Sequence, residues 1–92
     1  MAFVVKVATT TVDDSSTEIL ASGTEQVTVE VTAMDAPVWV HVTGGEAVAS
    51  GTNCRPVPQN ESRNFSLPGG HNGLTAIRDD STDAEVAVAT LA

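Results

Sequence analysis

The chain has 92 residues, enough for one domain, which we expect to span residues 1–92. Four basic residues stand against twelve acidic ones, so the formal net charge at pH 7 is −8. Such a surface cannot neutralise a phosphate backbone, so we expect no nucleic-acid partner and no membrane partner. The single cysteine, Cys54, excludes an internal disulfide. The first seven residues lack the pattern of a signal peptide, so we expect synthesis in a cytoplasm.

The side chains available for a core are small. Valine and alanine dominate the hydrophobic residues, and the aromatic residues are only Phe3, Trp39 and Phe65. Burial of apolar area has to offset the entropy lost when the chain is ordered. So thin a core therefore predicts that contacts with other subunits supply part of the stability.

The first half of the chain predicts five short strands. β-Branched residues such as valine and threonine suit a pleated sheet, and no long stretch has the apolar spacing of a helix. The clearest strand is Gln26 to Thr32, where Val27, Val29 and Val31 point to one side. In chain order the five strands are Phe3 to Thr10, Glu18 to Ala21, Gln26 to Thr32, Val38 to Thr43 and Glu46 to Ala49.

The second half predicts three more strands, Glu61 to Leu67, Leu74 to Arg78 and Glu85 to Leu91. They follow a loop from Ser50 to Asn60, where two prolines exclude a central strand. The last strand carries small apolar residues on both faces, which predicts a central position in a sheet or burial at an interface. The whole pattern predicts an all-β fold, a small antiparallel β-sandwich or barrel of six to eight short strands.

Trp39 and His41 are two candidate contact residues on one strand. If the valines of Val38 to Thr43 face the core, Trp39 and His41 face outward together. An exposed tryptophan on a sheet would anchor a partner. The reverse assignment, with Trp39 in the core, is equally open, because the domain has little other bulk.

The N-terminal segment, residues 1–12, is the second candidate contact region. Its apolar residues form a run without a clean inward face, which predicts an extended arm or an edge strand. Arms and unpaired strand edges are satisfied by neighbouring chains. The candidate contact residues in this segment are Phe3, Val5 and Val7.

No pattern in the sequence predicts catalysis or a metal centre. His41, His71 and Cys54 could supply three metal ligands, but their spacing matches no metal-binding motif. The acidic segments 13–18 and 79–85 lack the pattern of a calcium loop, so solvated carboxylates explain them. We therefore expect no cofactor, no metal and no enzymatic activity, with thiol chemistry at Cys54 as the enzymatic alternative.

The order of features between Thr24 and Leu91 resembles that of small phage virion proteins that decorate capsids or the surfaces of heads and tails. In that group a strand of alternating valines precedes an aromatic strand ending in glycine, a Val-Ala stretch, and three further strands. The corresponding segments here are Val27-Thr28-Val29-Glu30-Val31, Val38-Trp39-Val40-His41-Val42-Thr43-Gly44-Gly45, Ala47-Val48-Ala49-Ser50-Gly51, Ser62-Arg63-Asn64-Phe65-Ser66-Leu67-Pro68, Leu74-Thr75-Ala76-Ile77 and Val86-Ala87-Val88.

The resemblance implies a capsid decoration protein, made in the host cytoplasm and bound to the exterior of the virion. Its implied partners are the major capsid protein and other copies of the chain, often in a trimer, and it implies neither cofactor nor catalysis. The acidic charge suits the outside of a particle and not its DNA-filled interior. The alternatives are a tail or head–tail connector component, or an immunoglobulin-like or carbohydrate-binding module. The latter would use Trp39, His41 and Asn64 as a platform on one face.

Overall fold

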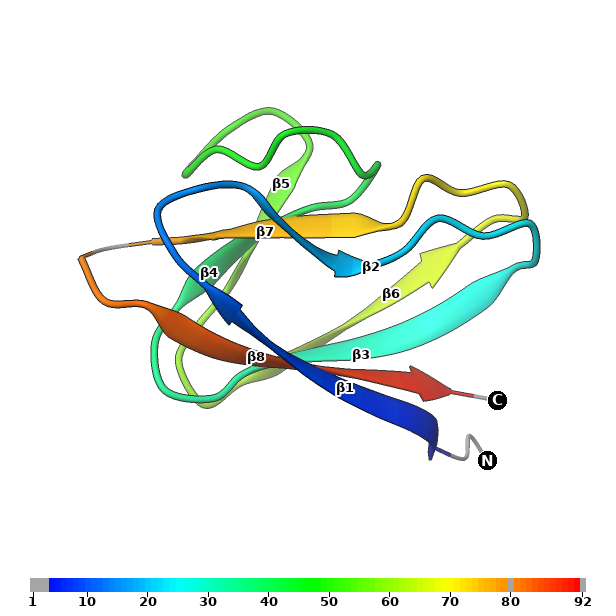
Figure 1. The fold of residues 1–92 in the computed structure, drawn as a ribbon, viewed down its shortest axis with the longest axis horizontal. Helices are drawn as coiled ribbons and strands as arrows, with labels where there is room; N and C mark the ends of the chain where they lie inside the picture. The colour runs from blue at the N-terminus through cyan, green and yellow to red at the C-terminus, as the bar shows by residue number, and fades with distance from the viewer. Residues whose placement is uncertain (1–3, 80, 92) are drawn as a thin grey trace.

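A computed structural model describes residues 4–79 and 81–91, and these form eight β-strands (Figure 1). In chain order they are β1 (Val4–Val12), β2 (Thr17–Leu20), β3 (Val27–Ala33), β4 (Val38–His41), β5 (Cys54–Val57), β6 (Ser62–Leu67), β7 (Leu74–Arg78) and β8 (Ala84–Leu91). The all-β prediction is confirmed. Among the described residues there is no helix of the length and apolar character needed to cross a membrane.

The strands form two antiparallel sheets of four. Sheet A has the order β1-β8-β3-β6, and sheet B has the order β2-β7-β4-β5. The pairs β1–β8, β2–β7, β3–β6 and β4–β5 nest inside one another, as in a long hairpin that has been rolled up. This strand order defines a jelly roll, a sandwich built from two Greek keys. β8 lies between β1 and β3, which confirms the central position predicted for the last strand.

The core lies between the two sheets and consists mainly of valine. Alternation along the strands buries valines on three of them. These are Val29 and Val31 of β3, Val38 and Val40 of β4, and Val86 and Val88 of β8. Leu74 is the largest of the side chains that are fully buried. The predicted thin core is therefore present, and its faces are those that the valine alternation indicates.

By strand direction, the seven connections leave the sheets at two opposite ends of the sandwich, and the longest, between β4 and β5, then arches over the molecule (Figure 1). Residues 13–16, 34–37, 58–61 and 79–83 connect strands at one end, which we call the acidic end. Residues 21–26, 42–53 and 68–73 connect strands at the other, which we call the glycine end because all seven glycines occur in these three segments. Backbone hydrogen bonds join neighbouring connections at each end.

The long connection 42–53 folds back over the outer face of sheet B. Ala47 is 1% exposed, and its N–H donates to Ser16 Oγ over 2.8 Å. The hydroxyl of Thr75 on β7 donates to the carbonyl oxygen of Gly45. The chain itself therefore covers the part of sheet B around Thr75.

Two local predictions are wrong, and a third, which left two alternatives open, is resolved. Residues 46–49 form part of the connection 42–53 and not a strand. Ala47 is buried there, and its backbone N–H donates to Ser16 Oγ and not to a neighbouring strand. Cys54–Val57, predicted as loop, form β5 at an edge of sheet B, where Pro56 costs no central hydrogen bond. The N-terminal segment was predicted as an arm or an edge strand, and from Val4 to Val12 it is the edge strand β1, paired with β8.

Candidate functional site

The outer face of sheet A is uncovered by any described segment of the chain and is the first candidate site. Inward valines on β3 and β8 place the alternate residues of all four strands outward. We call this set the sheet A face. Its residues are Val4, Val7, Thr9 and Thr11 on β1, Glu85, Ala87, Ala89 and Leu91 on β8, Thr28, Glu30 and Thr32 on β3, and Ser62, Asn64 and Ser66 on β6.

The sheet A face carries little charge and consists mostly of small side chains. Its ionisable residues are Glu30 and Glu85, although the whole chain has a net charge of −8. Glu85 accepts a hydrogen bond from the hydroxyl of Thr11 over 2.6 Å. Hydroxyl groups pair across β3 and β6, with Thr32 and Ser62 2.7 Å apart. A partner can cover such a face without burying many charges, because the side chains are small and several of them are already hydrogen-bonded to one another.

The valines at the start of β1 extend this face to the edge of sheet A. Val4, Val5 and Val7 are 61%, 65% and 59% exposed. The register of β1 on β8 shifts between Val4 and Lys6, so Val5 lies at an irregularity of the edge. Exposed apolar side chains at the margin of a bare face are typical of interaction sites. Val5 and Val7 were predicted as contact residues, and Phe3 lies outside the described residues.

Trp39 and His41 lie on the opposite side of the sandwich. With Val38 and Val40 buried, both point outward from sheet B, which settles the face that the sequence left open. Trp39 is half-buried, and its indole N–H donates to Asp79 Oδ1. His41 Nδ1 accepts the backbone N–H of Gly45 over 3.0 Å and thereby anchors the connection 42–53. The structure therefore does not bring these two residues together with the β1 valines.

The proposed glycan platform is not a single surface. Trp39 and His41 point outward from sheet B, whereas Asn64 belongs to the sheet A face. Register places Cys54 directly opposite His41 on sheet B. Because His41 Nδ1 already accepts backbone N–H groups, this ring nitrogen is not free to accept a proton from the thiol.

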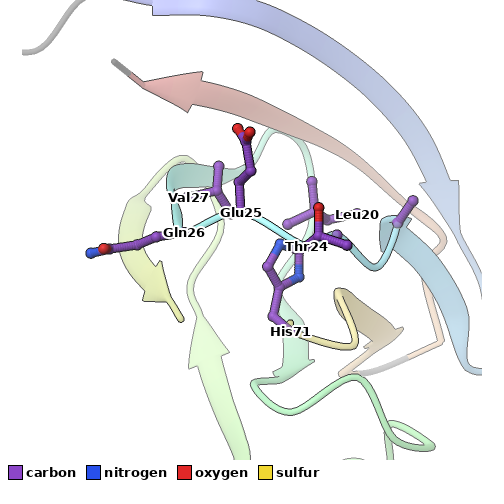
Figure 2. Close-up of a pocket in the computed structure, with 8 residues that line it drawn as sticks. Leu20, Thr24, Glu25, Gln26, Val27 and His71 are labelled. Atoms are coloured by element: carbon purple, nitrogen blue, oxygen red, sulfur yellow. The ribbon is translucent and has the colours of Figure 1, made fainter. Parts of the chain in front are cut away.

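His71 lines a shallow depression of about 380 Å³ at the glycine end, shown in Figure 2. Its Nδ1 accepts the N–H of Gly73 over 3.0 Å, and its carbonyl oxygen accepts the N–H of Gly23 over 3.1 Å. The side chains of Glu25 and Gln26 point away from the imidazole ring (Figure 2). His71 therefore joins the connections 21–26 and 68–73. The described side chains that line the depression place no second catalytic group beside its imidazole ring.

The carboxylates of the acidic end are engaged with the protein itself. Asp83 accepts from Arg78 over 2.6 Å, and Asp35 accepts the backbone N–H of Glu85 over 2.8 Å. Across residues 4–79 and 81–91, no three histidine, cysteine or acidic side chains are grouped so that they could hold a metal ion. These acidic turns act as structural acceptors in the described part of the chain.

A second groove, which sequence reasoning missed, opens between the edge strands β5 and β6. It has a volume of about 350 Å³ and is lined by Val42, Arg55, Pro56, Arg63, Asn64 and Phe65. In the strand predicted at Glu61 to Leu67, alternation puts Arg63 on the same side as the apolar Phe65 and Leu67, so the inward direction of Arg63 could have been read from the sequence. Arg55 lay within the predicted loop, and no alternation could be read there.

Comparisons with known proteins found no relative of this chain. No protein-family model, no curated protein and no solved structure matches the chain.

Proposed function

We propose that this chain is a virion structural protein that decorates the outer surface of a phage capsid and stabilises the shell. The observation that carries the proposal is the sheet A face, bare and poor in charge on an otherwise strongly acidic molecule. The other face of the sandwich is partly covered by the chain's own connection 42–53, which bonds to Ser16 and to Thr75 of β7. A partner would therefore dock on sheet A and leave the acidic end in solvent.

The order of strands and turns supports the same function. It resembles that of small virion proteins, and the jelly roll is a fold found in viral capsid domains. Because one fold serves many functions, the fold alone carries little weight, and the face carries the argument. Copies that bind where capsid subunits meet add contact free energy and resist the pressure of packaged DNA. The thin valine core is consistent with a homo-oligomer, for which we favour a trimer.

The first test is sedimentation of the purified protein with capsids of the parent phage assembled without it. We expect the protein to sediment with the shells in a fixed copy ratio and to raise the temperature at which filled particles release DNA. Protein that stays in the supernatant, with an unchanged release temperature, would refute the proposal.

A variant tests whether the sheet A face makes the contact. Val7→Glu places a carboxylate on the exposed margin of the face, where a partner would have to desolvate it, and should weaken capsid binding about tenfold or more. The matched control is Val48→Glu, since Val48 is 51% exposed in the connection over sheet B. Equal loss of binding in both variants would contradict docking through sheet A.

Two other functions give different results in these experiments. A tail or head–tail connector component would appear as a ring at the neck of the particle and not over the shell. A carbohydrate-binding module would use Trp39, which lies with Pro37, Pro56 and Pro58 around a depression of about 200 Å³. Lectin domains share the jelly roll, so a glycan-array signal that is lost in Trp39→Ala would favour that module.

A further inference from the structure

The groove between β5 and β6 has two arginines on inward-facing positions. Arg55 pairs with the buried Val40 and therefore points to the inner side of sheet B. Arg63 pairs with the buried Val31 and points to the inner side of sheet A. Packed sheets lie roughly 10 Å apart. The two guanidinium groups therefore flank one slot, at the open side of the sandwich where no described strand joins the sheets.

The positive charge of this slot is largely uncompensated. The guanidinium of Arg55 has no hydrogen-bond or ion-pair partner among residues 4–79 and 81–91. Arg63 makes a long contact of 3.4 Å with Glu61 and a hydrogen bond of 3.0 Å to the carbonyl oxygen of Ser62. The chain contains twelve acidic residues and only four basic ones, so its net charge is negative. The groove, flanked by two of the four cations, is a positively charged site on this acidic molecule.

The floor of the slot is apolar. Phe65 is partly buried against the core, and Val42 and Pro56 complete the lining. A ligand that fills this slot therefore gains by covering apolar surface and by placing anionic groups beside two arginines. Arginine favours carboxylates in particular, because its planar fork donates two parallel hydrogen bonds to one carboxylate.

The edge of β6 presents backbone groups along the slot that are not bonded to β3. The N–H of Ala33 donates to the carbonyl oxygen of Glu61, so the odd-numbered residues of β6 are those that bond to β3. The N–H and C=O groups of Ser62, Asn64 and Ser66 consequently point away from β3 at the edge of sheet A, where the C=O of Ser62 accepts the hydrogen bond from Arg63. Pro56 cannot donate a backbone hydrogen bond, which weakens β5 as a site for an added strand.

We propose that this slot binds an extended acidic peptide segment of a partner protein. The segment adds a strand to the edge of β6, and its backbone pairs with Ser62, Asn64 and Ser66. Alternate side chains enter the slot, where carboxylates meet Arg55 and Arg63 and apolar groups pack on Phe65. This inference does not depend on the capsid proposal, because it rests on two arginines on the inner sides of the sheets and on the backbone edge of β6. The slot adjoins the sheet A face at Asn64.

The test is fluorescence anisotropy with the labelled eight-residue peptide Thr-Glu-Thr-Val-Thr-Glu-Thr-Val, whose glutamates and valines lie on one face of a strand and can enter the slot together. We expect it to bind, and we expect the same peptide with lysine in place of both glutamates not to bind. Placing proline at one central threonine should abolish binding, since it removes a backbone donor to β6. Arg55→Gln should weaken binding about tenfold, and raising the salt to 1 M should weaken it further. The matched control is Lys6→Gln, a loss of one cation on β1 at the other edge of sheet A.

Amide hydrogen exchange separates strand addition from simple charge attraction. The peptide should slow exchange at Ser62, Asn64 and Ser66 and leave the N–H groups of β1 unchanged. Because the Arg55 guanidinium has no partner among the described residues, Arg55→Gln should fold normally, and the effect of Arg63→Gln can be compared with it. Binding of both peptides alike, an equal effect of Lys6→Gln, or exchange that does not change on β6 would each overturn the proposal.

Discussion

At both ends of the sandwich the connections between strands are held to one another, but by different kinds of contact (Figure 1). At the acidic end, carboxylates add to the backbone hydrogen bonds between segments, as Asp35 accepts from the backbone N–H of Glu85 and Asp83 from Arg78. At the glycine end, connections pack backbone against backbone at Gly44 and Gly73, at separations that leave no room for a side chain. A Cβ atom on Gly44 would lie 2.4 Å from the carbonyl oxygen of Asn72.

Because of this difference, we expect substitutions at the two ends to lower the free energy of unfolding by different amounts. A hydrogen bond at an exposed turn contributes modestly, since water can replace either partner. A steric overlap between two backbones cannot be relieved by water and requires both connections to move. The glycine end is therefore expected to control the stability of the fold, while the acidic end adjusts it.

The largest effect is expected for Gly73→Ala. Gly73 has φ +81°, and a Cβ there would lie 2.1 Å from the carbonyl oxygen of Leu20. We expect a loss of about 3 kcal/mol or more in the free energy of unfolding, measured by urea denaturation. Gly70→Ala is the control, because Gly70 has φ +78° but nothing within 4 Å of the added Cβ. It should cost only about 1 kcal/mol, and equal losses would show that close packing at Gly73 is unimportant.

A smaller effect is expected for Asp35→Ala at the acidic end. The change removes the acceptor that joins the β3–β4 connection to the backbone N–H of Glu85 over 2.8 Å. The site is exposed, so the expected loss is about 1 kcal/mol in the same denaturation experiment. Asp35→Asn retains a side-chain oxygen and should recover most of the stability. A loss as large as that of Gly73→Ala would contradict the ranking of the two ends.

The smallest effect is expected for Arg78→Gln. Arg78 contacts Asp83 at 2.6 Å and Asp14 at 4.0 Å, and its guanidinium offsets repulsion among the carboxylates of the acidic end. We expect a loss of about 0.5–1 kcal/mol at low salt that disappears near 1 M salt. Arg55→Gln provides the comparison, since it removes a cation without a described partner and should change stability little. A loss that persists at high salt would mean that Arg78 acts through packing.

Most of the strands could be predicted from the chain, because alternation is a local property. The valines of β3 and β4 specify an inward face without reference to the rest of the molecule, and β7 has the predicted limits. β5 could not be predicted from the sequence alone. Two prolines and a glycine nearby favour a loop, and only pairing with β4 stabilises this segment as a strand at the sheet edge.

The candidate sites depended more on tertiary structure. Sequence alone indicated an acidic all-strand domain with a thin core and exposed apolar residues at Val5 and Val7. It could not show that Trp39 and His41 lie on the other face, that sheet A is bare, or that Arg55 and Arg63 meet at one slot. Local patterns determine which way a side chain points along its own strand. Which strands become neighbours, and which face a loop covers, is decided by the long-range pairing of the whole chain.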